Sequence, residues 1–562
     1  MSAERSAVVV GGGVAGLATA ALLARDGWSV DVLERSDAVG GRAGTWESGG
    51  FRFDTGPSWL LMPEVFERFF AEAGTTLAER LDLVTLDPAY RVLFEDGDPL
   101  EVVADRAANL ATFEAAEPGA GAALDRYLRS ARSTYETALR RFLYTSFDTP
   151  GGLLHPEVAL QGHRLAPLLL RSLESFVARR FREPRLRQVL GYPAVFLGTS
   201  PDRAPSMYHL MSALDLEGGV RYPRGGFGRL VDALADVARE AGARLRTGWE
   251  VTAVTTRATG AGAAGAGAEG AGAEGAGAEG ARPGRAGRHA AVTGVRCTDP
   301  GGVERHLPAA LVVGAADLHH VETRLLPPAL QTYPEAWWRR RDPGPGGVLA
   351  MLGVRGRVPQ LAHHTLLFTR DWRRNFADIA AGVVPEPASA YVCAPSRTDP
   401  TVAPPDHENL FVLVPVPADP GLGRGGVDGR GAPAVERVAD AAIDQLARWA
   451  GVPDLAERVV VRRTVGPGDF AADLHAWRGG MLGPGHTLRQ SAFLRAGNAS
   501  RKVAGLYYAG SGTIPGVGLP MCLISAEILR DRVRREVGAP GAAGRAGSRA
   551  PTRARRPRVG AP

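Results

Sequence analysis

Hydrophobic and polar positions at the start of the chain follow the order of a strand, a helix and a second strand. Residues 8–10 form a β-branched run, which is the composition of a buried parallel strand. Glycines follow this run, and residues 17–25 then have the composition of a helix. Another apolar run over residues 28–33 predicts a second strand that ends at Glu34. This order predicts an α/β fold built on a parallel sheet.

Similar patterns continue through the rest of the chain. Apolar residues at helical spacing fill residues 122–142 and 165–189, and residues 340–420 alternate as a mostly antiparallel sheet does. Further helices are expected over residues 229–240, 433–450 and 524–537. Further strands are expected over residues 243–246, 251–254, 292–296 and 311–315.

Two segments carry no such pattern. Residues 258–290 repeat small Gly-Ala and Ala-Glu-Gly units with no large apolar side chain, and they lie between two predicted strands, so we expect a disordered insert in a hairpin loop. Residues 538–562 contain six arginines and no acid, and we expect a disordered basic tail. Because much of the net charge of +6 lies in this tail, the body is close to neutral and no nucleic-acid partner is expected.

Composition limits the protein class further. A chain of 562 residues is too long for one hydrophobic core, so two or more domains are expected. No uninterrupted apolar run reaches transmembrane length and the N-terminus has no signal-peptide core, which predicts a cytoplasmic protein. The three cysteines are far apart with no C-x-x-C pair, so the spacing predicts neither a redox dithiol nor a zinc site and no metal is expected.

The glycines after the first strand have the spacing of a dinucleotide site. Gly11, Gly13 and Gly16 fit G-x-G-x-x-G, in which the first glycine permits the turn, the second admits a pyrophosphate and the third packs helix on strand. Glu34 follows about 20 residues later, where an acid binds a ribose hydroxyl. The ordered strand, glycines, helix, strand and acid predict a Rossmann-type nucleotide domain.

The residues after Glu34 distinguish FAD from NAD. Arg35 leads to Gly41 and Arg42, and Gly56 and Pro57 follow a short apolar stretch. This resembles the extended FAD signature of the amine oxidase and phytoene desaturase superfamily, in which the arginine lies near the FAD phosphates. A guanidinium suits that place because it pairs two phosphate oxygens at once.

Several later stretches, in order, resemble the bacterial phytoene desaturases (carotenoid desaturases). They are residues 222–226, 361–365, 391–396, 399–405, 412–417 and 505–521. The resemblance implies a p-hydroxybenzoate-hydroxylase-like flavoprotein fold with a mixed-sheet substrate domain. It also implies that Val251 contacts the adenine side of FAD, and that Gly510, Gly512, Gly518, Leu519, Pro520 and Met521 wrap the ribityl chain and flavin. Two positions depart from the family pattern: Ile514 stands where the family often has histidine, and residues 521–523 differ from the small residues common there. These departures leave the exact polyene substrate open.

The resemblance also divides the chain. The predicted parts are FAD-binding segments at 1–95, 221–325 and 463–537, a helical substrate and membrane-associating segment at 96–220, the substrate-domain sheet at 326–462, and the tail at 538–562. Within 165–189 apolar stretches alternate with arginines. Such a segment is either a helix packed on the body or an interfacial helix at an anionic membrane surface, which would make the protein peripheral to the cell membrane.

The activity implied by the resemblance is FAD-dependent desaturation of a C40 carotenoid precursor, from phytoene toward neurosporene or lycopene. A hydride passes to the flavin and a proton leaves the adjacent carbon, with oxygen or a quinone as the final electron acceptor. The substrate is a long apolar polyene. No catalytic side chain is nominated: His363, His364 and His475 are expected to be hydrogen-bonded loop histidines, and Asp54 and Asp215 capping or packing residues.

Three other functions remain open at this stage. The first is another flavin oxidase, acting on an amine or on protoporphyrinogen. The second is a carotenoid cis-trans isomerase that uses reduced FAD without net oxidation. The third is a lipid-binding escort on the same fold, like the GDP-dissociation inhibitors, which lack a tight FAD site.

Overall fold

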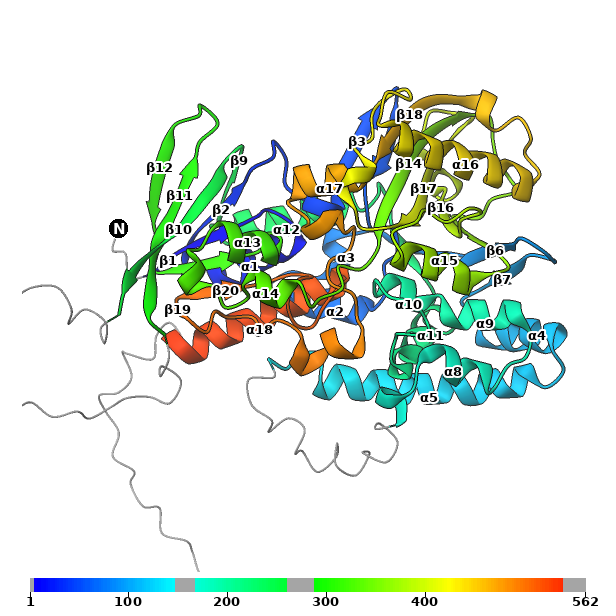
Figure 1. Ribbon diagram of the computed structural model, residues 1–562, viewed down its shortest axis with the longest axis horizontal. Coiled ribbons are helices and arrows are strands. Elements are labelled where there is room, and N and C mark those ends of the chain that lie inside the picture. Colours follow the sequence, from blue (N-terminus) through cyan, green and yellow to red (C-terminus); the bar gives the residue numbers. More distant parts are fainter. Residues whose placement is uncertain (1–4, 147–166, 260–287, 539–562) are drawn as a thin grey trace, which may run out of the picture.

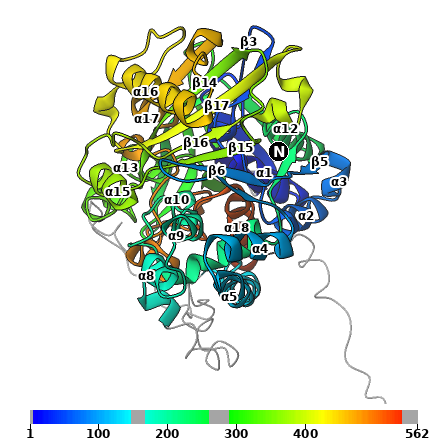
Figure 2. The same ribbon diagram turned by 90° about the vertical axis from the view of Figure 1, so that its right-hand side faces the viewer.

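The computed structural model describes residues 5–146, 167–259 and 288–538 (Figure 1). The disorder predicted for residues 258–290 and 538–562 concerns segments that lie almost wholly outside this range. Figure 1 shows a nucleotide-type sheet with its helices at the left, a larger sheet at the upper right, and a group of helices below the larger sheet. Figure 2 shows the larger sheet above the helical group from the side.

A five-stranded parallel sheet forms the first part, in the order β20-β13-β1-β2-β9. Its strands are β1 (Ser6–Val10), β2 (Ser29–Glu34), β9 (Arg244–Thr247), β13 (Leu311–Gly314) and β20 (Leu506–Tyr508). Segments from both ends of the chain therefore meet in one sheet, as the resemblance implied. The FAD-domain fold class is confirmed by this topology.

Alternating residues of β1 face two different layers. Ala7 and Val9 pack with three helices, and Val8 and Val10 pack with a second sheet. The helices are α1 (Val14–Arg25), α12 (Gly228–Glu240) and α18 (Leu519–Val537). The second sheet contains β10 (Glu250–Ala258), β11 (Ala290–Thr298), β12 (Glu304–Pro308) and β19 (Val503–Ala504). Both faces of the parallel sheet are covered, which explains its continuous apolar runs.

The predicted hairpin around the small-residue insert is confirmed. Strands β10 and β11 pair antiparallel, and the last pair of the ladder joins Ala258 to Ala290. Both predicted strands extend to the edges of the insert, so its first and last residues belong to the ladder. Residues 260–287 lie outside the described range.

The substrate part contains a seven-stranded sheet in the order β18-β14-β17-β16-β15-β6-β7. Its strands are β6 (Tyr90–Phe94), β7 (Leu100–Val102), β14 (Gly346–Arg355), β15 (His364–Phe368), β16 (Ala390–Cys393), β17 (His407–Val416) and β18 (Val459–Val465). All neighbouring strands pair antiparallel except β15 and β6, which confirms the mostly antiparallel prediction. Helix α16 (Pro433–Ala450) covers one face through Val435, Ala439 and Ile443.

The helical group corrects one prediction. Helix α5 (Ala120–Arg141) matches its expected range, but residues 165–189 do not form one helix. The described part, residues 167–189, includes α8 (Leu173–Ala178) and the start of α9 (Pro184–Gly191), where Pro184 favours a helix start. Phe176 and Phe181 are buried in the protein core, whereas Leu169 and Leu170 of the same stretch are 39% and 79% exposed.

Shorter elements join these parts. They are η2 (Gly41–Ala43), β3 (Thr45–Ser48), β4 (Phe51–Asp54), α2 (Pro63–Glu72), α3 (Leu77–Arg80), β5 (Leu83–Thr85), α4 (Arg106–Ala116), α10 (Pro193–Phe196), η4 (Ser206–Met211), α11 (Ser212–Asp215), β8 (Arg221–Pro223), α13 (Leu318–Arg324), α14 (Glu335–Trp338), α15 (Trp372–Ala380) and α17 (Pro467–Leu474). Among the described residues, no helix has both the length and the apolar composition needed to cross a bilayer.

Candidate active site and cofactor cavity

A cavity of about 920 Å³ lies where the parallel sheet, the seven-stranded sheet and the helical group meet. All residues predicted to bind the cofactor line it except Gly16, which packs beneath the first glycine. The predicted residues that line it are Gly11, Gly13, Glu34, Arg35, Gly41, Arg42, Gly56, Pro57, Val251, Gly510, Gly512, Gly518, Leu519, Pro520 and Met521. Residues up to 510 positions apart in the sequence thus face one space.

The glycine loop has the geometry that its motif predicts. Gly11 has φ +103°, and a Cβ on Gly16 would lie 2.0 Å from the Gly11 carbonyl oxygen, so neither position accepts a side chain. A Cβ on Gly13 would meet nothing nearer than 3.9 Å. Gly13 is the N-cap of α1, and no side chain caps this helix. Its first backbone N–H groups are therefore available to an anion in the cavity.

A second helix begins at the same cavity. Gly518, with φ +123°, is the N-cap of α18, and no side chain caps this helix either. Leu519, Pro520 and Met521 form its first turn and line the cavity. Two helix N-termini, one from each end of the chain, therefore give the cavity a positive potential where a phosphate-bearing cofactor could lie.

Glu34 is held by the backbone at the end of β2. Its Oε2 accepts a hydrogen bond from the Gly12 N–H at 2.8 Å, and its Oε1 accepts one from the Ser36 N–H at 2.9 Å. A carboxylate has lone pairs beyond these two, so Glu34 could still accept a hydroxyl donor from the cavity. The contact with Gly12 was not predicted, although Gly12 lies inside the glycine motif.

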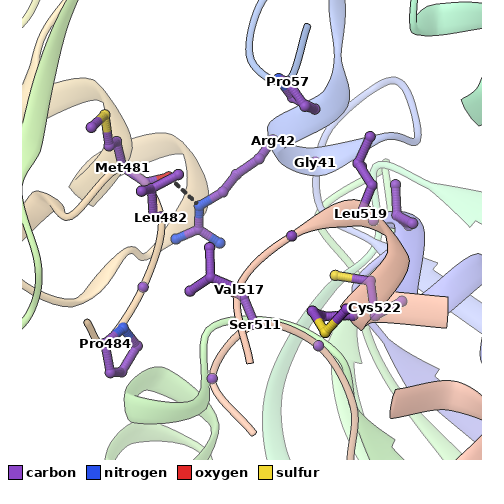
Figure 3. Close-up of a pocket in the computed structure, with 18 of the residues that line it drawn as sticks. Gly41, Arg42, Pro57, Met481, Leu482, Pro484, Ser511, Val517, Leu519 and Cys522 are labelled. Carbon is purple, nitrogen blue, oxygen red and sulfur yellow. Dashed lines mark hydrogen bonds between the residues drawn. The ribbon is translucent and has the colours of Figure 1, made fainter. Parts of the chain in front are cut away.

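Arg42 carries an unsatisfied donor into the cavity. Its Nε donates to the Met481 carbonyl oxygen at 3.0 Å, while Nη2 is buried without a hydrogen-bond partner, 4.0 Å from Asp317 Oδ2 (Figure 3). Figure 3 shows the guanidinium between the segment of Met481 and Leu482 and the segment of Ser511 and Val517. A buried arginine donor without a partner fits an anionic ligand, and the residues present therefore fit the phosphates of FAD.

Arg35 and Val251 also line the cavity. Arg35 Nη1 lies 2.7 Å from His475 Nε2, and His475 stacks on His320 with ring centroids 3.8 Å apart. Burial, with the nearby His475 and Arg35 charges, lowers the pKa of His320 to about 4, and burial followed by Arg35 lowers the pKa of His475. Both rings are thus neutral at neutral pH and form flat walls. His475 is a hydrogen-bonded loop histidine, as predicted.

Sequence reasoning missed three residues that shape the segment 510–518. Arg495 is buried and donates to four carbonyl oxygens, among them that of Thr513 at 2.9 Å, and its burial lowers its pKa to about 10. The buried Asn498 amide donates to the Tyr508 and Ile514 carbonyl oxygens. His486 Nε2 accepts from the Val517 N–H at 3.1 Å. These residues lie in an irregular polar segment without a motif, so no local signal identifies them.

The rest of the cavity is apolar. It extends between the helical group and the seven-stranded sheet and reaches side chains with exposed edges. The apolar wall residues include Trp59, Leu61, Met62, Phe142, Leu143, Phe196, Met207, Leu210, Met211, Leu214, Phe411 and Leu413. Leu169, Leu488, Phe493 and Leu494 also line it and are 39–53% exposed. This arm suits a long apolar ligand and not a hydrated one.

The two aspartates behave as expected. Asp54 accepts the backbone N–H groups of Phe227 and Gly228 at the start of α12, and Asp215 accepts the Tyr90 and Tyr192 hydroxyl groups. Neither lines the cavity. Both are therefore capping or packing residues.

Comparison with known proteins identifies the family. The model of the flavin containing amine oxidoreductases matches residues 14–273. The chain is 39% identical to a carotenoid 3,4-desaturase from Haloarcula japonica, over 92% of this chain and 96% of that protein. It is 36% identical to a phytoene dehydrogenase from Streptomyces griseus, over 94% of each chain.

Solved structures share the fold at low identity. Putrescine oxidase bound to putrescine superposes with a TM-score of 0.55 at 14% identity, over 94% of this chain and 99% of that one. Cyclohexylamine oxidase from Brevibacterium oxydans superposes with a TM-score of 0.54 at 14% identity, over 95% and 99%. The chain belongs to the carotenoid and phytoene desaturases, FAD-dependent oxidoreductases that act on CH–CH groups within the flavin-containing amine oxidoreductases.

Proposed function

We propose that this protein desaturates an acyclic C40 carotenoid precursor, taking phytoene toward neurosporene or lycopene. The observation that supports this most is the continuity of the cavity: groups suited to a dinucleotide at one end share one space with a long apolar arm at the other. The walls of the arm are mostly apolar, which suits a hydrocarbon better than an amine.

The residues that hold FAD in this proposal act through a few contacts. Arg42 Nη2 would pair the phosphates, assisted by the N-termini of α1 and α18. Glu34 would accept from a ribose hydroxyl, and Arg35, Val251 and residues 510–521 would line the rest of the cofactor space. When bound, FAD supplies the two-electron acceptor that hydride removal from a carbon requires.

The protein itself binds, orients and keeps the site dry. The apolar arm aligns the polyene and excludes water, which holds the hydrogen-bearing carbons in place and removes water as a competing proton donor. His486 is neutral because burial lowers its pKa well below the ordinary value; its Nδ1 donates to the Tyr208 hydroxyl at 2.8 Å. This pair fixes the wall where the arm meets residues 515–518. The electrons finally pass to oxygen or a quinone.

The exposed apolar side chains suggest how a water-insoluble substrate reaches the arm. Leu170 is 79% exposed and Leu494 is 53% exposed, next to cavity-lining Leu169 and Phe493. We propose that these side chains dip into a membrane surface, which makes the protein peripheral and lets a polyene pass from lipid to cavity without crossing water.

Expression in cells that accumulate phytoene tests the activity. Pigment extracts should contain carotenoids with a longer conjugated system than phytoene, identified by chromatography and absorption spectra. The matched control is Arg42→Gln, which should give protein with less flavin and less pigment. Flavin-loaded wild-type protein that leaves phytoene unchanged would overturn this substrate.

A second substrate is supported by the 39% identity to a carotenoid 3,4-desaturase. In that case the protein extends the conjugation of an already coloured acyclic carotenoid at its end. The same expression in lycopene-accumulating cells decides between the two, because a red shift of lycopene without conversion of phytoene supports the second substrate. Isomerisation without a change in mass would support the isomerase instead.

A further inference from the structure

We propose that His363, His364 and Cys393 form a zinc-binding site behind the wall of the apolar arm. This site is independent of the proposed substrate. One ring nitrogen from each histidine and the Cys393 sulfur lie within 4.8 Å of one another. All three side chains are buried, with 5%, 0% and 3% exposed surface.

The fold brings these residues together where two strands meet. His364 begins β15 and pairs directly with Cys393 at the end of β16. His363 precedes the strand, and its ring lies across that of His364, with centroids 4.5 Å apart and planes at 73°. The cysteines are distant in sequence from one another, so cysteine spacing could not reveal a site built from one cysteine and two adjacent histidines.

The hydrogen bonds of both histidines leave one ring nitrogen unused. His363 Nδ1 lies 2.8 Å from Thr398 Oγ1, and His364 Nδ1 lies 2.8 Å from the Tyr391 hydroxyl. Both Nε2 atoms are buried without a hydrogen-bond partner. A proton on each Nδ1, donated to its hydroxyl, leaves a lone pair on each Nε2, which is the form in which histidine binds metals.

The donor set points to zinc. Two imidazoles and a thiolate are borderline to soft ligands, which favour Zn²⁺ over Mg²⁺ or Ca²⁺. Zn–N and Zn–S bonds of about 2.0 and 2.3 Å at tetrahedral angles place ligand atoms on a common ion roughly 3.3–3.5 Å apart. The observed separations are at most 4.8 Å. Ion binding therefore has to draw the three side chains together by at most roughly 1.5 Å, through χ rotations.

The neighbouring residues connect this site to the cavity wall. Trp59 stacks on His364 with centroids 4.6 Å apart, and the Tyr391 hydroxyl lies 2.6 Å from Ser58 Oγ. Trp59, Ser58 and Tyr391 all line the cavity. An ion bound to the three ligands would therefore fix the β15–β16 end and, through His364, the wall on which the polyene lies.

The purified, FAD-loaded full chain is first treated with a chelator and then titrated with cobalt to test the site. We expect one equivalent of Co²⁺ to produce a thiolate-to-cobalt charge-transfer band in the difference spectrum, and Zn²⁺ to displace it. Zinc-edge X-ray absorption should then show two nitrogen ligands and one sulfur ligand. Cys393→Ser should abolish the band, while the control Cys297→Ser, another buried cysteine, should retain it.

Thermal unfolding gives a second measurement. Zn²⁺ should raise the Tm of wild-type protein and of Cys297→Ser, but not that of Cys393→Ser or His364→Gln. Wild-type protein that shows no charge-transfer band and no zinc-dependent Tm shift would overturn the proposal, even if the variants fail to fold. A band that persists in Cys393→Ser would equally overturn it.

Discussion

Gly516 and His486 lie so close that any side chain at Gly516 would overlap the histidine ring. A Cβ on Gly516, whose φ is +142°, would lie 2.2 Å from His486 Cε1 and Nε2. The same Nε2 accepts the Val517 N–H, so the ring fixes the backbone of the cavity wall just before α18. The glycine is thus required by a side chain thirty residues away and not by a turn alone.

Replacing Gly516 with alanine should therefore displace His486 and loosen the wall. We expect Gly516→Ala to lower the Tm by several degrees and to weaken FAD binding about tenfold or more, measured by flavin fluorescence titration. The control is Gly242→Ala, which has φ +97° but nothing within 4 Å of the added Cβ. If both variants lose FAD equally, backbone strain and not the His486 contact explains the loss.

Removing the Arg42 guanidinium should weaken cofactor binding. Arg42→Gln loses the donor that has no hydrogen-bond partner in the protein, and a charge-assisted hydrogen bond contributes about 1.5–3 kcal/mol, so the Kd for FAD should rise roughly 10- to 100-fold. Isothermal titration of apoprotein with FAD measures this. Arg339→Gln, at an exposed position, is the matched control and should bind FAD as the wild type does.

Asp215 should make stability depend on pH. Burial raises the pKa of Asp215 to about 6, although the Tyr192 and Tyr90 hydroxyl groups oppose the shift. A carboxyl with a raised folded-state pKa stabilises the fold below about pH 4, and this contribution is lost as the pH rises through about 6. We therefore expect the unfolding free energy of the wild type, relative to that of Asp215→Asn, to fall by up to about 3 kcal/mol between pH 4 and 7.

Urea unfolding at saturating FAD measures that difference. Asp232→Asn, on the exposed face of α12, should leave the pH profile unchanged. A difference between wild type and Asp215→Asn that is the same at every pH would show that Asp215 has an ordinary pKa in the folded protein.

The exposed apolar side chains at the cavity should govern membrane binding. We expect Leu170→Ser combined with Leu494→Ser to weaken binding to anionic lipid vesicles tenfold or more, because each change removes apolar surface that would leave water. Vesicle co-sedimentation measures this. Val303→Ser, exposed on the far β11–β12 connection, is the control. Equal vesicle binding by all three proteins would contradict the proposed membrane surface.

The cofactor end of the site could be predicted from sequence because its residues lie in local motifs. Gly11 and Gly16 lie where the turn and the helix–strand contact require glycine, and Arg42 lines the cavity with much of the C-terminal stretch 505–521 that resembled the family. The pairing of β10 with β11 was predicted from the insert between them, but their place in a second sheet, separate from the parallel sheet, was not.

The missed residues act through long-range contacts. Arg495 and His486 hold the segment 510–518 from a loop with no periodicity, and their importance follows only from burial. Helix was predicted over residues 165–189 and is present in the described part, but in separate pieces such as α8 and α9, because apolar spacing continues through Pro184, where the backbone starts a new helix. Phe176 and Phe181 are apolar because they are core residues, which periodicity cannot distinguish from a lipid-facing surface.

The parallel sheet joins strands made at very different times during synthesis, because β1 pairs with β13 and β13 pairs with β20. The glycine loop leaves the ribosome first, but α18 and the wall at residues 510–521 are among the last described residues to be made. At about 5–20 residues per second, the nascent chain spends roughly 25–100 s with half of its cofactor site absent. Complete flavin binding is therefore a late step, because the cavity wall at residues 510–521 has to be made first.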